Sequence, residues 1–306
     1  MTYPRAHLVD EENGGYYHCT SRCVRRAWLC GHDPVSGNSY DHRKQWIENR
    51  ILRLARHFAV DLYAYAVMSN HYHLVVRSVP KRTYGWTPEE VAKRWLSRHG
   101  GPRQPKMKEK ISNLLSQPGR IEILRRRLGS LSWFMRDINE PLARIANAED
   151  DCSGRFWEGR FKSVALLDRN AILNCMVYVE LNPARANPYT PIPCKHTSGQ
   201  LRNHSRKTIL ANLEQLDLSL SSYLQLLRWT HQLTKNPRST AAAPKKILVS
   251  LGQSEREWLA HVHAHSARYR AYGMQNALSK YLKKIGQRWI QMPTLRSSRA
   301  PISSPI

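Results

Sequence analysis

The chain has 306 residues, in which 48 Lys and Arg outnumber 23 Asp and Glu and give a formal net charge of +25. This excess favours a polyanionic partner, and nucleic acid fits it better than a membrane surface. No apolar run approaches the roughly 18 residues of a membrane-spanning helix, and no signal-peptide pattern opens the chain. We therefore expect an intracellular protein.

The six cysteines include no Cys-x-x-Cys pair. Cys19 and Cys23 lie near His18 and His32, but the spacings fit no common zinc module. Reduced, mostly buried thiols are the expectation.

The first eighty residues have the pattern of an α+β domain. Residues 15–24, 60–68 and 71–78 have strand composition, whereas residues 41–57 carry an apolar stripe at helical spacing. The order of strand, helix and strand pair predicts an antiparallel sheet with helices packed on one face.

Two histidines, His71 and His73, flank one tyrosine at the start of the third expected strand. Because side chains alternate along a strand, both imidazoles point to the same face and can coordinate one divalent cation. A lone His-x-His is more often structural, so a second half-site is required. A similar pair, His261 and His263, has helical surroundings, where positions i and i+2 do not face each other.

A basic insertion spans residues 80–130. Its basic side chains either contact phosphates or form a solvent-exposed face, and the sequence leaves both alternatives open. They are Arg103, Lys106, Lys108, Lys110, Arg120, Arg125, Arg126 and Arg127. Residues 131–148 then predict a helix that bends near Pro141.

Residues 155–166 predict a strand with a tight turn at Glu158 and Gly159. By strand alternation Arg160 and Lys162 share a face, and with Arg155 they are candidates for contact with a phosphate backbone. Ordinary surface charge is the alternative.

The second half-site is a helix that Asp168 caps and that Pro183 is expected to end. Tyr178 and Asn182 stand at i and i+4, so they share a face of its last turn. A tyrosine and an amide oxygen presented together suit a nucleophile beside a metal ligand. Glu180 is the substitute ligand if Pro183 pulls Asn182 off this face.

Four segments together resemble one family. Residues 67–76 resemble the metal strand of the HUH nucleases. Residues 178–186, Tyr-Val-Glu-Leu-Asn-Pro-Ala-Arg-Ala, resemble the nucleophile helix of the REP-associated tyrosine transposases, the single-tyrosine HUH family. Residues 154–163 and 17–23 match further segments of that family, and the order is the same. The resemblance covers residues 15–190.

The resemblance implies the α+β sandwich of the HUH nucleases and a catalytic role for Tyr178. His71, His73 and Asn182 would hold Mg²⁺ or Mn²⁺. The expected reaction on single-stranded DNA leaves a 5′-phosphotyrosine and a free 3′-OH, and it then joins a different 3′-OH without ATP. The expected targets are hairpin-forming repetitive extragenic palindromes in the bacterial cytoplasm, near the nucleoid. The DNA-binding candidates are Arg155, Arg160, Lys162 and Arg185.

Two other functions stay open. One is a domesticated DNA-binding protein without turnover, and intact candidate residues argue against it. The other is a replication initiator or relaxase-type nickase, whose motifs are ordered differently. The sequence also leaves open whether the protein acts as a monomer or a homodimer.

We predict a catalytic domain over residues 1–195 and a helical, basic extension over residues 196–306. Within the extension, residues 234–246 have the composition of a linker. Ser254 and Glu257 form a capping box for a helix expected to reach Tyr272, with Gly273 as its C-cap. A second, basic helix is expected over residues 276–290, for duplex DNA or for docking on the catalytic domain.

Overall fold

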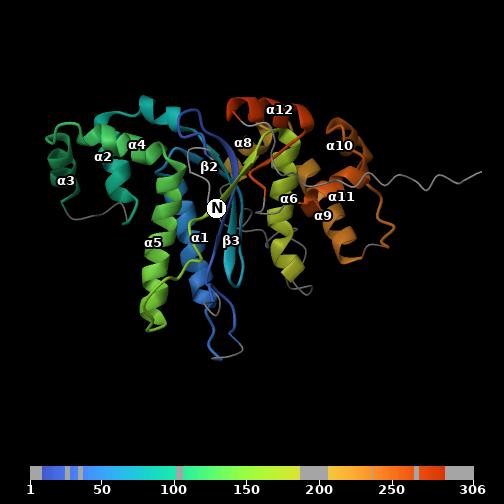
Figure 1. Ribbon diagram of the computed structural model, residues 1–306, viewed down its shortest axis with the longest axis horizontal. Coiled ribbons are helices and arrows are strands. Elements are labelled where there is room, and N and C mark those ends of the chain that lie inside the picture. The colour runs from blue at the N-terminus through green and yellow to red at the C-terminus, as the bar shows by residue number, and fades with distance from the viewer. Residues whose placement is uncertain are drawn as a thin grey trace, which may run out of the picture.

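The computed structural model describes residues 9–24, 28–33, 37–100, 106–186, 206–236, 238–264 and 269–286. A five-stranded sheet in the order β2-β3-β1-β4-β5 stands at its centre (Figure 1). Neighbouring strands are antiparallel except β4 and β5, which are parallel. The strands are β1 (Gly15–Arg22), β2 (Val60–Val67), β3 (His71–Ser78), β4 (Lys162–Leu166) and β5 (Ala271–Tyr272).

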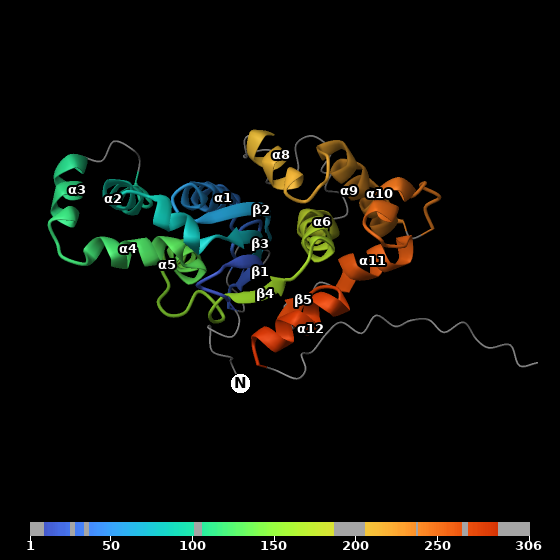
Figure 2. The same ribbon diagram turned by 90° about the horizontal axis from the view of Figure 1, so that it is seen from above.

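Helices cover both faces of the sheet, and Figure 2 shows the two layers in profile. The first layer contains α1 (Asp41–Ala55), the 3₁₀ helix η2 (Pro80–Gly85), α2 (Pro88–Ser97), α3 (Met107–Leu115), α4 (Arg120–Gly129) and α5 (Leu131–Glu149). The second contains α6 (Arg169–Ala186), α8 (Arg206–Glu214), α9 (Leu220–Lys235), α10 (Lys245–Ser250) and α11 (Glu255–Ala264), and α12 (Gln275–Lys284) lies beside the β4–β5 edge.

Strand alternation explains the two cores. In β3, Leu74 joins the core under α1 and α5, while Val75 joins the core under α6. Each fully buried aliphatic side chain contributes about 1.5–3 kcal/mol relative to its exposed state. Arg43 further ties α1 to the end of α5 through ion pairs with Glu149 and Asp150.

The α+β class predicted from sequence is confirmed, but the expectation of helices on one face is wrong. The cause lies in α6, which is buried on nearly all sides. Met176 and Val177 belong to the core under the sheet, and so do Leu226 of α9 and Trp258 of α11. A helix without a polar face needs cover on its outer side, and the C-terminal helices supply it.

The C-terminal extension is part of this common core, because β5 pairs with β4 and α11 packs on α6. The boundary at residue 195 lies among residues outside the described ranges, so the two-domain division stays a prediction. The structure nevertheless joins both segments in one sheet.

Three local expectations need correction. The strand expected over 155–166 is confined to Lys162–Leu166; before it, only Trp157 forms a bridge, with Cys23. Pro183 lies inside α6 instead of ending it. The capping box of Ser254 and Glu257 is present, with backbone-to-side-chain distances of 2.8 and 3.2 Å. Its helix is described over Glu255–Ala264 and does not reach Tyr272, because Ala271 and Tyr272 form β5.

Gly273 is not a helix C-cap. It follows β5, where a Cβ atom would lie 2.8 Å from Asp168 Oδ2, so close packing explains the glycine. The expected basic helix is α12, and residues 287–290 of that expectation lie outside the described residues.

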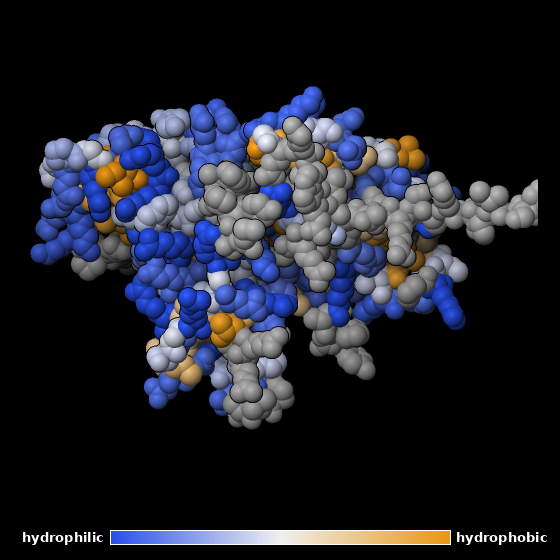
Figure 3. Space-filling model, in the orientation of Figure 1, coloured by the Kyte–Doolittle hydropathy of each residue, from blue (hydrophilic) through white to orange (hydrophobic). Residues whose placement is uncertain are grey.

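The surface shown in Figure 3 is mostly hydrophilic, and its apolar areas are small and separate. No helix in the described part of the chain is long and apolar enough to cross a membrane. Large apolar patches mark docking or membrane surfaces, and this face has none in its described part.

Candidate functional site

The two motif histidines lie at the start of β3 and face α6. Their ring centroids are 4.8 Å apart. His73 is buried, whereas His71 is half-buried at the end of the strand. On the neighbouring strand β1, Thr20 stands opposite His73 and Arg22 stands opposite His71.

Hydrogen bonds engage one nitrogen of each imidazole. Nδ1 of His71 donates to Oδ1 of Asn70 at 2.6 Å. Nδ1 of His73 lies 2.9 Å from Nε2 of His18 and 3.2 Å from Oγ1 of Thr20. Nε2 of His73 is buried and has no hydrogen-bond partner among the described residues.

Both imidazoles are neutral at physiological pH. Burial lowers the pKa of His71 to about 4, and the Arg22 charge adds to the shift. Burial also holds the pKa of His73 well below 6.5, with further lowering by His18, His71 and Arg22. A neutral imidazole keeps the lone pair that a metal ligand needs.

His18 of β1 is a third histidine of this cluster, and sequence reasoning missed its role. Its ring stacks on His73 with centroids 5.0 Å apart and an interplanar angle of 21°. Burial lowers its pKa to about 4. Alternation places His18 on one face with Thr20, but only the pairing of β1 with β3 sets it against His73.

Tyr178 of α6 completes the cluster. Its ring centroid lies 5.8 Å from that of His73 and 5.9 Å from that of His18, edge to face in both cases. Burial raises the pKa of Tyr178, while polar contact with Asn182 and the charge of Arg185 lower it. The net shift is upward, so the hydroxyl is protonated at neutral pH.

The helix keeps Asn182 one turn beyond Tyr178. Because α6 continues through Pro183 to Ala186, the proline does not displace Asn182 from the Tyr178 face. Glu180 is buried on the side of α9, where its charge adds to the effect of burial and raises the pKa of Tyr223. The structure therefore brings Asn182, and not Glu180, to the tyrosine.

Arg185 links this site to the C-terminal extension. Its guanidinium carbon lies 5.3 Å from the centroid of the Tyr178 ring. Its Nη2 lies 3.3 Å from Nδ1 of His263 in α11. The His261–His263 pair does lie in a helix, as predicted, yet His263 reaches the edge of the site through a contact that spacing cannot reveal.

The DNA-binding candidates of the preceding segment are exposed. Lys162 opens β4 opposite Thr20, two strands away from His73. Arg155 and Arg160 lie in the irregular segment before β4, so the expected strand alternation does not apply to Arg160. None of the three forms an ion pair with a described residue.

The basic insertion folds into η2 and α2–α4, and part of its charge is structural. Arg125 is buried and donates to the backbone oxygen of Trp86 at 2.7 Å. Arg127 stacks over Trp133, with 4.2 Å from its guanidinium carbon to the ring centroid. These arginines satisfy carbonyls and cover tryptophan rings, so charge in the insertion cannot be equated with phosphate contacts.

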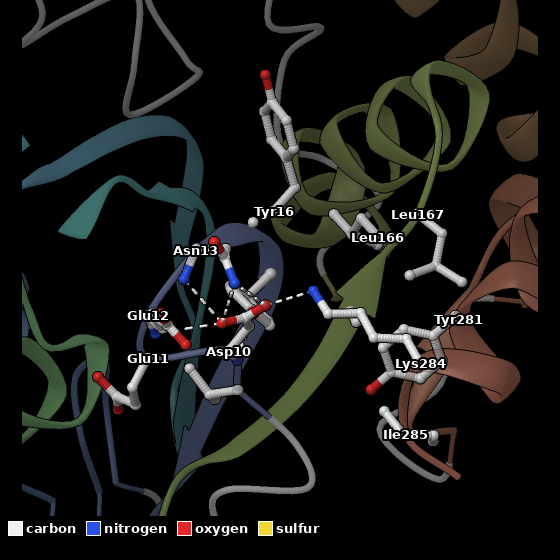
Figure 4. Close-up of a pocket in the computed structure, with 15 residues that line it drawn as sticks. Asp10, Glu11, Glu12, Asn13, Tyr16, Leu166, Leu167, Tyr281, Lys284 and Ile285 are labelled. Atoms are coloured by element: carbon white, nitrogen blue, oxygen red, sulfur yellow. Dashed lines mark hydrogen bonds and ion pairs between the residues drawn. The ribbon is translucent and has the colours of Figure 1, made fainter. Parts of the chain in front are cut away.

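A hollow of about 640 Å³ lies at the opposite end of β1, between the 9–15 loop and α12. Figure 4 shows Asp10 at its centre, accepting from the backbone of Asn13 at 2.8 Å and paired with Lys284. Glu11 and Glu12 add negative charge to the wall. This acidic lining disfavours a phosphate backbone, so the hollow is not part of the site.

His18, His71 and His73 do not form a metal centre on their own. Among the described residues, no three His, Cys, Asp or Glu side chains are placed to hold a metal ion. His18 stacks on one face of the His73 ring.

Comparison with known proteins gives one distant likeness. No protein-family model matches the chain, and no curated protein matches it. The chain is similar to a solved structure of a REP-associated tyrosine transposase bound to a REP hairpin. Identity is 14%, coverage is 61% of this chain and 75% of that chain, and the TM-score is 0.35. A likeness of this size is a weak link between folds, and no site residue is assigned from it.

Proposed function

We propose that the protein is a metal-dependent DNA nicking and strand-transfer enzyme that acts on single strands through a 5′-phosphotyrosine at Tyr178. The observation that carries this proposal is the joint placement of Tyr178, His73 and His18, with ring centroids within 6 Å, beside Asn182. The net charge of +25 supports a nucleic-acid substrate. The sequence motifs favour hairpin-forming repetitive extragenic palindromes as targets.

The residues of the site fit a hard divalent cation. His71, His73 and Asn182 would hold Mg²⁺ or Mn²⁺, because both imidazoles are neutral and Nε2 of His73 is buried without a partner among the described residues. When bound, such an ion polarises a phosphate and neutralises charge that develops during displacement. His18 supports this set when its Nε2 accepts from Nδ1 of His73, because that tautomer leaves Nε2 of His73 unprotonated.

In the proposed reaction, the Tyr178 oxygen attacks phosphorus and forms an ester to the 5′ side. The bond from phosphorus to the 3′ oxygen breaks, and that oxygen takes up one proton as the tyrosine loses one. The Arg185 guanidinium, over the tyrosine ring, stabilises the phenolate that forms. The ester conserves the bond energy, so attack by another 3′-OH joins strands without ATP.

The test uses the full chain, Mn²⁺ and single strands from the flanks of its own gene, labelled at either end. The proposal expects a 3′-labelled strand to become covalently attached to protein, while a 5′-labelled strand yields a shorter free product. A DNA-binding protein without turnover would shift both strands in a native gel and attach neither. That result would overturn the proposal.

A further inference from the structure

A second cavity lies on α6, one helical turn before the nucleophile. It has a volume of about 240 Å³. The start of α6, α11, β5 and the start of α12 enclose it. Its wall includes Asp168, Asn174, Glu257, His261, Tyr272 and Met274.

Asn174 is a buried polar group without a hydrogen-bond partner in the part of the chain that the structure describes. Its side chain is 0% exposed, and neither Oδ1 nor Nδ2 has a hydrogen-bond partner among the described residues. Buried amides are hydrogen-bonded in most proteins, because desolvation without compensation is costly. Asn174 lies in the wall of this cavity, so a ligand held there is one way to complete its amide.

Other polar groups of the wall are already engaged. Asp168 Oδ1 accepts from the backbone of Ala171 at 2.8 Å, and Oδ2 accepts from that of Met274 at 2.5 Å. Nδ1 of His261 lies 2.8 Å from Nε2 of Gln253. Asp168 and Glu257 bring carboxylates to the wall, and these disfavour a phosphate or another anion.

The remaining features describe a small, planar, neutral ligand. The volume is below the roughly 300–1,000 Å³ of pockets for drug-sized molecules. The rings of His261 and Tyr272 stand edge to face in the wall, with centroids 5.9 Å apart. An asparagine amide offers one donor and one acceptor side by side, the pattern that matches the edge of a base.

We propose that this cavity receives one nucleobase of the strand held at Tyr178, and that Asn174 reads its edge. This inference rests on the proposed function for the source of the base. Asn174 precedes Tyr178 by four residues, so it lies about 6 Å away along the helix axis and on the same face. Helix α11 supplies His261 to the cavity and His263 to Arg185, beside the tyrosine. The cavity therefore lies about one helical turn from the tyrosine.

The experiment is an abasic scan of a labelled single strand from the flank of the gene. Binding to the full chain is measured in EDTA, so no step depends on cleavage. We expect one abasic position near the cleavage point to weaken wild-type binding about tenfold, the order of one lost edge contact. Asn174→Leu should bind the intact strand about tenfold more weakly than wild type does. An abasic site at that position should not weaken the binding of this variant further.

Asn212→Leu is the matched control. Asn212 is also buried, but its Nδ2 donates to the backbone oxygen of Leu62 at 2.8 Å. This variant should lose thermal stability and keep the wild-type abasic profile. Asn174→Leu should keep or gain stability, because it removes an unpaired amide. Asn174→Ala is a second variant should the larger side chain prevent folding.

A parallel thermal-shift titration uses the four free deoxynucleosides. A second outcome is that one nucleoside raises the melting temperature of wild type but not of Asn174→Leu, while no abasic position changes strand binding. That result would support binding of a base from a free nucleoside and not from a strand. Parallel abasic profiles for wild type and Asn174→Leu, together with no nucleoside shift, would overturn the inference. Absence of the covalent adduct would count against the proposed function alone, since neither readout needs cleavage.

Discussion

At the scale of single residues, the proposed role of Tyr178 depends on one atom, its hydroxyl oxygen. Its ring packs against His18 and His73, and its hydroxyl is the proposed nucleophile. The spacing of Tyr178 and Asn182 was predictable, because positions i and i+4 share a helix face whatever the fold. The surroundings of the ring were not, because they come from two strands far away in the chain.

We expect Tyr178→Phe to abolish the covalent adduct and to leave DNA affinity within about twofold of wild type. Phenylalanine keeps the ring and its packing and loses only the oxygen. Adduct formation is checked on a denaturing gel, and affinity is checked by anisotropy. Tyr84→Phe, at a tyrosine that is 73% exposed, is the control and should behave as wild type. An adduct with Tyr178→Phe would remove this residue from the proposed role.

His18 gives the second prediction at this scale. Loss of a partner that orients a ligand histidine costs about 10–100-fold in metal affinity. We therefore expect His18→Leu to weaken Mn²⁺ binding by that amount without altering DNA affinity in EDTA. His18→Gln should restore part of the loss, because an amide oxygen can accept from Nδ1 of His73. Manganese titration of the free protein checks both variants, and equal affinities for Leu and wild type would contradict the assignment.

At the scale of elements, periodic patterns predicted well and irregular segments did not. The strands over 60–67 and 71–78 and the helix over 41–55 follow from local alternation and apolar spacing. The strand prediction failed over 155–161, where Phe156 and Phe161 are buried and the described pairing is limited to the isolated bridge of Trp157 with Cys23. The two residues of β5 are a strand only because β4 lies beside them, which no local pattern records.

The site shows the same division between local and distant information. His71, His73, Tyr178 and Asn182 came from two local spacings, and the structure places the ring centroid of Tyr178 5.8 Å from that of His73. His18 and His263 needed the register of β1 with β3 and the packing of α11 on α6. Register and helix packing depend on the whole chain, so these two residues lay beyond reach of the sequence patterns.

The packing of α11 on α6 gives a third prediction. Trp258 is fully buried, and its Nε1 donates to Oγ1 of Thr230 in α9 at 2.9 Å. We expect Trp258→Ala to lower the free energy of unfolding by about 3–5 kcal/mol. Because this tryptophan shares a core with α6, the loss should move a single urea transition that also reports on the tyrosine helix.

Trp46→Ala is the matched control, since Trp46 is 37% exposed on α1. It should change the free energy of unfolding far less. Two separate urea transitions, of which Trp258→Ala moves only one, would instead favour the independent C-terminal unit expected from the linker composition.

At the scale of the whole molecule, buried histidines couple stability to pH. Burial lowers the pKa of His18 to about 4, and burial likewise holds the pKa values of His73 and His231 below 6.5. The unfolded chain takes up protons below pH 6.5, whereas the folded chain resists them until lower pH. The stabilising contribution is thus complete above pH 6.5 and is lost as pH falls toward 4.

We accordingly expect the melting temperature, measured in EDTA, to fall steadily between pH 7 and pH 5. His231→Leu should flatten this dependence, because it removes a buried histidine of α9 that is not among the proposed site residues. His32→Gln, at an exposed histidine, is the control and should keep the wild-type slope. A melting temperature that stays constant down to pH 5 would contradict the coupling.

The charge of the whole chain gives the last prediction. Many arginines serve the fold, as Arg98 does with Asp137 at 2.8 Å, so the net excess overstates the charge available to DNA. Contacts to about six phosphates of a single strand would give a log–log salt slope near −4. If Arg155, Arg160 and Lys162 make three of them, replacing all three with glutamine should reduce that slope by about 2. Anisotropy titrations at several salt concentrations measure the slope.

The comparison variant replaces Lys93, Lys108 and Lys110 of the insertion, which are also exposed. If only the variant of Lys93, Lys108 and Lys110 makes the salt slope less steep, the DNA strand contacts the insertion. The proposed contact of the strand with Arg155, Arg160 and Lys162 is then wrong.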